Sequence, residues 1–318
     1  MLYPQICVCL WFGLPSKVIL FAREPMPTHL YLAPACGGKT TYLVERARTL
    51  VAGLPLAGAA ATVRVVVPTH LQVRAWRRRL AEGGGAMGVR VGTFDALYRQ
   101  VLREAGQVYT RLSDPVQYRL LRLLAAETEL DHYRTLRAAP GFIRVVLDLI
   151  RELKAGGVFP EDLINAIDHT GSEPRLRELA DLYDAYQRHL QDKLWADAAG
   201  IGWLAQEALR DRINVARDWP CVMVDGFDDL TSVQLAVLRE LSARDGELIV
   251  TLTGVTTGAP RPQAHKRFND TRVRIESTLG IAAQPLPASL GADRRAAAIA
   301  HLEAALYAAG DLGRLAGG

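Results

Sequence analysis

The feature that most constrains the fold is the stretch THLYLAPACGGKTTYLVERA, which runs from Thr28 to Ala47. It begins as an apolar, strand-like run, passes through small residues and continues as amphipathic sequence. Its centre, APACGGKT at residues 33–40, fits the phosphate-binding template G-x-x-x-x-G-K-[ST], except that Ala33 replaces the first glycine. A strand before the loop and a helix after it predict a P-loop. The alternative is a glycine-rich turn with a solvated lysine.

Each residue type in this loop has a chemical reason. Small residues let backbone N–H groups wrap phosphates, a lysine reaches the β- and γ-phosphates, and a hydroxyl group holds Mg²⁺. The N-terminus of the following helix adds the positive end of its dipole. We therefore predict ATP and Mg²⁺ as cofactors. The expected nucleotide-binding residues are Ala33, Pro34, Ala35, Cys36, Gly37, Gly38, Lys39, Thr40 and Thr41.

A second acidic strand end supports the same chemistry. The stretch CVMVDGFDDLTSVQ places Asp225 directly after four apolar residues. An aspartate at the end of a buried strand, opposite a P-loop, can support a metal ion. We therefore predict Asp225 as the catalytic carboxylate and Thr40 with Asp225 as the Mg²⁺ site. The alternative for Asp225 is a helix-cap or turn aspartate.

Short apolar runs indicate a parallel sheet. Four of them are apolar throughout and rich in Val, Ile and Leu, which is typical of strands buried on both faces. Amphipathic helical patterns alternate with them, and this alternation predicts a doubly wound α/β fold. The expected strands are Leu30–Ala33, Val63–Val67, Cys221–Val224 and Leu248–Leu252, and the expected helices are Thr41–Ala52, Leu71–Ala81 and Thr231–Leu241.

The middle of the chain, from about Asp95 to Ala216, has a different pattern. Apolar residues recur three and four apart in segment after segment, which predicts helices and no convincing strand. One of these helices is expected to begin with Asp114 as its N-cap and Pro115 at its first position. A helical insert therefore interrupts the predicted α/β domain.

Composition excludes several classes of protein. The 318 residues are 49% hydrophobic and 23% charged, as in an ordinary globular protein, and the net charge of +4 permits nucleic-acid binding without requiring it. Four cysteines show neither zinc spacing nor a disulfide pattern, which favours a cytoplasmic location. The apolar residues 1–25 lack the basic start and cleavage site of a targeting segment. We expect an N-terminal extension there, with Met26 as the natural first residue.

Three further stretches, taken in order with the P-loop, carry a family resemblance. They are VVVPTHLQVRAWRRRL (Val65–Leu80), VGTFDALYRQVLREAG (Val91–Gly106) and VDGFDDLTSVQ (Val224–Gln234). These resemble motifs Ia, Ib and II of superfamily 1 helicases of the UvrD/RecB type. The likeness is greatest to the AddB-like subunit of bacterial ATP-dependent helicase–nucleases, and it extends over about residues 27–252.

The resemblance implies a fold and a division of the chain. The fold is α/β, with a RecA-like P-loop NTPase parallel sheet interrupted by an α-helical insert in the 1A/1B arrangement. Domain 1A would comprise residues 26–100 and 217–290, and the insert 1B would comprise residues 101–216. Residues 291–318 would begin a truncated C-terminal region. The family's second RecA-like domain and its PD-(D/E)xK nuclease find no counterpart in this sequence.

The resemblance also implies a function. The chain would be the N-terminal part of a helicase–nuclease subunit that binds ATP and single-stranded DNA, or duplex ends, in double-strand break repair and recombination. An AddA-like helicase–nuclease subunit would be its partner, and no membrane is involved. Two alternatives stay open: a non-catalytic P-loop scaffold that binds a partner subunit, and a P-loop enzyme of another class, such as a small-molecule kinase.

Candidate DNA-binding residues follow from two of these motifs. The resemblance places Thr69 and Thr93 where family members touch the single-strand backbone, with Phe94 beside that contact. For Phe94 the alternative is packing under the sheet. Arg77, Arg78 and Arg79, together with Trp76 in the same basic helix, are candidates for contact with a nucleic-acid backbone. Their alternative is a solvated helix face.

Departures from the family pattern concern hydrolysis. Gly226 stands where motif II normally has a catalytic glutamate, while Asp228 and Asp229 lie further along. Asp95 replaces the histidine of motif Ib and brings a negative charge near the expected phosphate path. After residue 252 the sequence TGVTTGAPRP replaces a motif that senses the γ-phosphate. We therefore expect a degraded motor that binds ATP and hydrolyses it very slowly.

Overall fold

The computed structural model of the chain describes residues 27–53, 62–82, 84–85, 87–171, 174–255 and 265–287. The expected N-terminal extension (1–25), the C-terminal region (291–318) and a helical pattern within the latter lie outside the described residues. Residues 256–264 also lie outside the described residues, and they include the end of the stretch TGVTTGAPRP that replaces the family's γ-phosphate-sensing motif.

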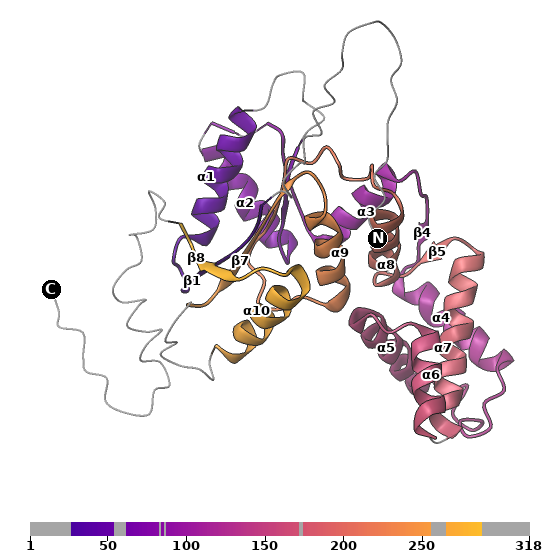
Figure 1. The fold of residues 1–318 in the computed structure, drawn as a ribbon. Helices are drawn as coiled ribbons and strands as arrows, with labels where there is room; N and C mark the ends of the chain where they lie inside the picture. The colour runs from indigo at the N-terminus through magenta and orange to yellow at the C-terminus, as the bar shows by residue number, and fades with distance from the viewer. Residues whose placement is uncertain are drawn as a thin grey trace, which may run out of the picture.

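Six parallel strands form the central sheet, in the order β3-β2-β6-β7-β1-β8 (Figure 1). All four strands predicted from the sequence are present, while β3 at one edge and β8 at the other were not predicted as strands. The bounds are β1 Thr28–Ala33, β2 Val63–Val66, β3 Val89–Gly92, β6 Cys221–Val224, β7 Glu247–Thr253 and β8 Ala283–Pro285.

Helices cover both faces of this sheet (Figure 1). α1 (Lys39–Ala52) and α2 (His70–Glu82) bury Leu43 and Trp76 against one face. α3 (Phe94–Glu104), α8 (Gly200–Asp211) and α9 (Ser232–Ser242) cover the opposite face, and α10 (Lys266–Leu279) also packs there. The α/β class with a parallel sheet is therefore confirmed.

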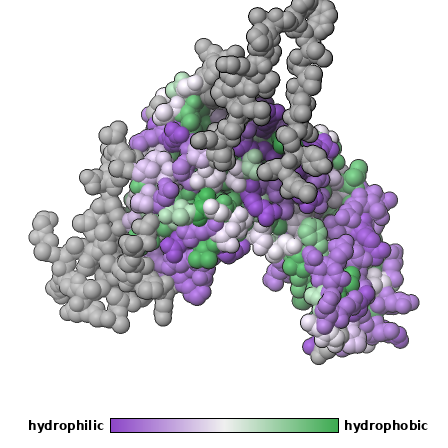
Figure 2. Space-filling view, viewed as in Figure 1, coloured by the Kyte–Doolittle hydropathy of each residue, from purple (hydrophilic) through white to green (hydrophobic). Residues whose placement is uncertain are grey.

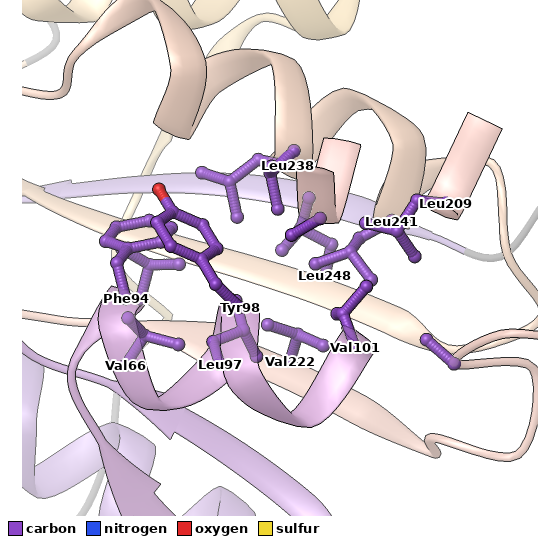
Figure 3. Close-up of a cluster of buried hydrophobic side chains, with 14 of the residues drawn as sticks. Val66, Phe94, Leu97, Tyr98, Val101, Leu209, Val222, Leu238, Leu241 and Leu248 are labelled. Carbon is purple, nitrogen blue, oxygen red and sulfur yellow. The ribbon is translucent and has the colours of Figure 1, made fainter. Parts of the chain in front are cut away.

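The larger core lies between the sheet and α3, α8 and α9 (Figure 3). Val66, Val222 and Leu248 reach it from three neighbouring strands, and Tyr98 and Leu238 meet them from the helices. Large apolar side chains drive this layer because each one that is removed from water contributes about 1.5–3 kcal/mol. The result is a rigid platform that fixes the ends of the strands.

The helical insert forms a lobe with its own core. Its helices are α4 (Asp114–Glu127), α5 (Pro140–Gly156), α6 (Pro160–Thr170) and α7 (Pro174–Asp192). A separate hydrophobic cluster runs from Leu112 to Leu190 and meets the body at Trp203 and Val233. Figure 2 shows the lobe standing off from the body, with a mostly hydrophilic surface and a hollow between its free end and α10.

Packing gives the lobe narrower limits than the bounds 101–216 that the sequence suggested. α8 and most of α3 belong to the layer that covers the sheet. The short strands β4 (Thr110–Arg111) and β5 (Trp195–Ala196) pair in parallel where the chain enters and leaves the lobe. The exact domain bounds stay a proposal.

Some local predictions need correction. Ser113, not Asp114, occupies the N-cap position of α4, so that the proline lies one position later than expected. The middle region was expected to hold no strand, yet the two-residue β4 and β5 form there. These are boundary effects, where propensity is weakest and tertiary contacts decide.

Membrane insertion has no support in the described part of the chain. None of its helices combines the length and the apolar character needed to cross a bilayer.

Candidate functional site

The glycine-rich loop joins the buried end of β1 to α1. Ala33 ends the strand, and Gly38, with φ of 84°, is the N-cap of α1. Cys36 also has a positive φ, 56°, although it carries a side chain. Non-glycine residues in this region cost about 1–3 kcal/mol and tend to occur at ligand-binding turns. Left-handed residues within a turn can point successive N–H groups into one concavity, which suits an anion.

Gly37 is needed for a different reason. A Cβ atom built there would lie 2.9 Å from the carbonyl oxygen of Pro34 and 3.2 Å from the Cβ of Ala33. The Gly37 N–H donates to that same Pro34 carbonyl at 3.0 Å, so the turn closes on itself. A larger residue would open the turn, which explains the glycine at this place.

The charge at the loop is positive. Lys39 Nζ donates to the carbonyl oxygens of Ala33 and Pro34 at 3.1 and 2.9 Å, which folds the ammonium group over the loop. The first turn of α1 itself holds no acidic residue, and the positive end of its helix dipole lies at this loop. The residues present therefore fit a phosphate group, because they supply backbone N–H groups, an ammonium and a helix N-terminus.

Asp225 lies beside this loop, at the end of β6. Its residue is 3% exposed, and three side chains donate hydrogen bonds to its carboxylate. Thr40 Oγ1 donates to Oδ2 at 2.8 Å, Trp76 Nε1 donates to Oδ2 at 3.0 Å, and Thr251 Oγ1 donates to Oδ1 at 3.0 Å. The two residues predicted as the metal pair, 185 positions apart, are thus in direct contact.

Sheet topology explains this meeting. β7 lies between β1 and β6, and all three strands run parallel, so their C-terminal ends share one edge of the sheet. β7 contributes Thr251, a polar residue within an apolar strand. Thr251 was not predicted as a partner because Leu248–Leu252 was taken as apolar throughout, although one threonine among four apolar residues was a visible signal.

Trp76 corrects an expectation about the basic helix. It was grouped with the neighbouring arginines as a candidate for contact with nucleic acid, but it is 2% exposed and its indole points inward to Asp225. Val73 and Leu80, at helical spacing from Trp76, are buried on the same face of α2. That spacing could have predicted its burial.

The consecutive arginines of α2 do not form one surface. Arg77 is exposed and its Nη2 lies 3.3 Å from the Val91 carbonyl of the edge strand. Arg78 pairs with Glu82 at 2.9 Å on the open side of the helix. Consecutive helical residues point about 100° apart, so a single strand of nucleic acid cannot meet all of them side by side. Contacts of Arg77 and Arg78 with DNA stay a prediction.

The threonines predicted to contact DNA occupy helix starts. At the start of α2, Thr69 and Gln72 form reciprocal side-chain and backbone hydrogen bonds of 3.2–3.3 Å. This arrangement has the geometry of a capping box. Thr93 is the N-cap residue of α3 and its side chain makes no cap hydrogen bond. Thr69 is exposed and Thr93 half-buried, so both remain accessible as predicted contacts.

Phe94 packs in the core beneath the sheet, which was the alternative to a contact with DNA. It is 5% exposed, and its ring lies 5.3 Å from the ring of Phe227 and 5.7 Å from that of Tyr98, centroid to centroid. The neighbouring Asp95 does not face a phosphate path unopposed, because Arg99 and Arg111 pair with it at 2.8 and 3.1 Å.

The turn after Asp225 has no carboxylate aimed at the loop. Gly226 has φ of 79°, and a Cβ there would meet the Gln72 amide nitrogen at 3.1 Å. Asp228 pairs with Arg267 at 3.0 Å, and Asp229 pairs with Arg274 at 2.9 Å, both on α10. These two aspartates therefore hold α10 against the turn. Within the described residues, no group of three or more His, Cys, Asp or Glu side chains is arranged to hold a metal ion.

Comparison with known proteins shows which family the sequence of this chain matches. The sequence profile described as "ADDB, N-terminal" matches residues 30–290, which include the loop, the Asp225 strand and the helical lobe. The chain belongs to this AddB family. Its resemblance to AddB-like subunits, first seen in four short motifs, is confirmed over most of its length.

Two curated relatives show the extent of the match. An ATP-dependent helicase/deoxyribonuclease subunit of Moorella thermoacetica is 29% identical over 312 residues, covering 88% of this chain and 26% of the relative. The protein of the same name from Exiguobacterium sibiricum is 27% identical over 221 residues, covering 67% of this chain and 18% of the relative. The AddB-family chain thus spans about a quarter or less of the length of these relatives.

Proposed function

We propose that this chain is the N-terminal, ATP- and single-stranded-DNA-binding part of an AddB-like helicase–nuclease subunit. It would act in double-strand break repair and recombination in the cytoplasm, with an AddA-like subunit as its partner. The sheet would be a RecA-like P-loop domain, and its motor function would be degraded. The observation that carries the proposal is the contact of Thr40 with Asp225 beneath a loop that gathers phosphate-binding groups.

The nucleotide proposal assigns a role to each side chain. Backbone N–H groups of residues 33–38 would surround the phosphates, and Lys39 would turn from the Ala33 and Pro34 carbonyls toward the β- and γ-phosphates. Thr40 and Asp225 would hold Mg²⁺ and its water shell. Bound Mg²⁺ would neutralise phosphate charge. Asp225 is already held in place by Thr251 and Trp76, so little reorganisation would be needed.

Calorimetric titration with Mg-ATP tests this role. Lys39→Ala should weaken binding about a hundredfold, because charge-assisted hydrogen bonds to phosphate are worth a few kcal/mol. Lys266→Ala is the matched control, since that lysine is exposed on α10 and pairs locally with Asp270. Equal affinities of the wild type and Lys39→Ala for Mg-ATP would refute nucleotide binding at this loop.

The scaffold alternative has one observation in its favour. Gly226 and its surroundings leave the loop without a carboxylate to orient water, while Asp228 and Asp229 are engaged by α10. A scaffold would bind the partner subunit with the same affinity whether or not Mg-ATP is present. An affinity for the partner that rises with Mg-ATP in wild type but not in Lys39→Ala would favour the nucleotide-binding proposal over the scaffold.

A further inference from the structure

A second concentration of positive charge lies far from the P-loop, at the β3 edge of the sheet. Arg64 of β2 and Arg90 of β3 are direct register partners, so their side chains share one face of the sheet. Like charges opposite one another destabilise a sheet. The edge is separated from β1 by four strand spacings of about 4.8 Å, or roughly 19 Å.

Arg64 is buried without full compensation. The residue is 4% exposed, and its guanidinium lies 4.5 Å over the ring of Trp219. Its Nη1 donates to the Thr62 carbonyl, but its Nε donates to no described group. Burial lowers the pKa of Arg64 to about 10, with Glu104 opposing this shift and Arg90 adding to it.

The nearest carboxylate is committed elsewhere. Glu104 lies 3.8 Å from Arg64, beyond hydrogen-bond distance. It accepts the indole N–H of Trp219 at 3.0 and 3.1 Å and the side-chain amide of Gln100 at 3.0 Å. Arg64 therefore keeps its charge inside the protein with one carboxylate at ion-pair distance and with its Nε unpartnered among the described residues, which is costly unless further negative charge lies nearby.

A pocket of about 300 Å³ opens at this place. Arg64, Arg90 and Arg77 line it, together with Gln100 and Thr93, and none of the described residues that line it is acidic. Arg77 bonds the outward-facing carbonyl of Val91 at the sheet edge. The pocket is thus large enough for a small ligand, and its charged side chains are three arginines among mainly apolar neighbours.

The geometry points to an oxyanion site of the phosphate class in this pocket, with the exposed Arg90 as its principal donor and the buried charge of Arg64 behind it. Arginine suits such a ligand because its planar fork can bond two oxygens at once. The phosphate would come either from a nucleic-acid backbone, which Thr93 at the pocket rim makes reachable, or from a free phosphate compound. The site does not depend on nucleotide binding at the P-loop.

The test uses the full chain carrying Lys39→Ala, so that the P-loop does not compete for phosphate. Sodium phosphate is titrated by calorimetry, and a fluorescent oligo-dT is titrated by anisotropy over a range of salt concentrations. Adding Arg90→Ala should weaken the binding of one of these two ligands about tenfold, as expected for the loss of a charge-assisted hydrogen bond. Arg188→Ala removes an equal charge on the exposed side of α7 and should change neither.

The two probes separate the sources of phosphate. A loss confined to oligo-dT, with the salt slope reduced by about 0.7, identifies a backbone phosphate. A loss in the phosphate titration identifies a free phosphate compound. Arg64→Met, which removes the buried charge, should reproduce the loss, and Arg90→Ala carries the test if that buried variant fails to fold. If Arg90→Ala binds both probes like Arg188→Ala, the site is refuted.

Discussion

Two buried aspartates in this molecule differ in what surrounds them. Asp197, at the joint between the helical lobe and the body, and Asp225, beside the P-loop, are each 3% exposed. Asp197 accepts from Lys154 Nζ at 2.7 Å and from the Gly200 N–H at 2.6 Å. The three side chains that donate to Asp225 are all uncharged.

This difference separates a structural carboxylate from one suited to bind a cation. Lys154 is fully buried, and its ammonium lies 5.4 and 5.3 Å from the ring centroids of Tyr186 and Trp203. Burial lowers its pKa, and Asp197 opposes that shift. The lobe joint therefore carries its own counter-charge. Among the described residues, the side chains that donate to Asp225 are neutral, which leaves a reason for a metal ion to bind beside Thr40.

The largest expected effect concerns turnover at Asp225. We expect ATP hydrolysis below about 0.01 s⁻¹, roughly a thousandfold under a common enzyme turnover of about 10 s⁻¹, because no group orients water and no arginine finger is present among the described residues. Asp228→Ala should change nothing, since Asp228 pairs with Arg267. Gly226→Glu should not restore turnover, because its backbone φ of 79° disfavours a side chain. Steady-state ATPase assays with single-stranded DNA check this, and robust stimulated turnover by wild type would contradict it.

The next largest effect concerns the lobe joint. Lys154→Met should lower the free energy of unfolding by about 3–5 kcal/mol, because it leaves a buried carboxylate uncompensated. Adding Asp197→Asn should recover most of that loss, since the neutral amide oxygen can still accept from Gly200. Urea unfolding of both variants measures this. A double variant no more stable than Lys154→Met would show that Asp197 is not the cause.

A smaller effect separates the two aspartates by their response to metal. In wild type, Mg²⁺ should strengthen ATP binding, and Asp225→Asn should reduce that strengthening about tenfold, as expected for a lost charged ligand. Asp197→Asn should leave it intact. The measurement is ATP affinity with and without Mg²⁺. Equal Mg²⁺ dependence in wild type and Asp225→Asn would remove the distinction drawn between the two sites.

The smallest effect concerns the indole groups. Trp76 donates to Asp225, whereas Trp203 donates to the Lys154 carbonyl at 3.1 Å, so the two Trp→Phe substitutions are matched. Trp76→Phe should strengthen the Mg²⁺-linked ATP binding about threefold, since the carboxylate loses a competing donor. An identical Mg²⁺ response in both variants would show that the indole does not influence Asp225.

Much of the fold could be predicted because its signals are local. The four strands are short apolar runs, and the helices after them follow amphipathic spacing, so both were predicted from neighbouring residues. β3 and β8 were missed because each lies at a sheet edge, where exposed residues such as Arg90 interrupt the apolar pattern. The N-cap of α4 was predicted one residue too late, at Asp114 instead of Ser113. A helix cap depends on few atoms, so the local sequence specifies its position weakly.

The sequence by itself determined the composition of the glycine-rich loop and the order of most strands and helices along the chain. Each depends on residues a few positions apart. Only the tertiary structure decided that Trp76 points inward to Asp225, that Asp228 faces α10, and that Arg64 lies beside Arg90. Those contacts depend on which strands become neighbours and in which register. Neither is visible in local pattern, because strand order is set by packing between segments far apart in the sequence.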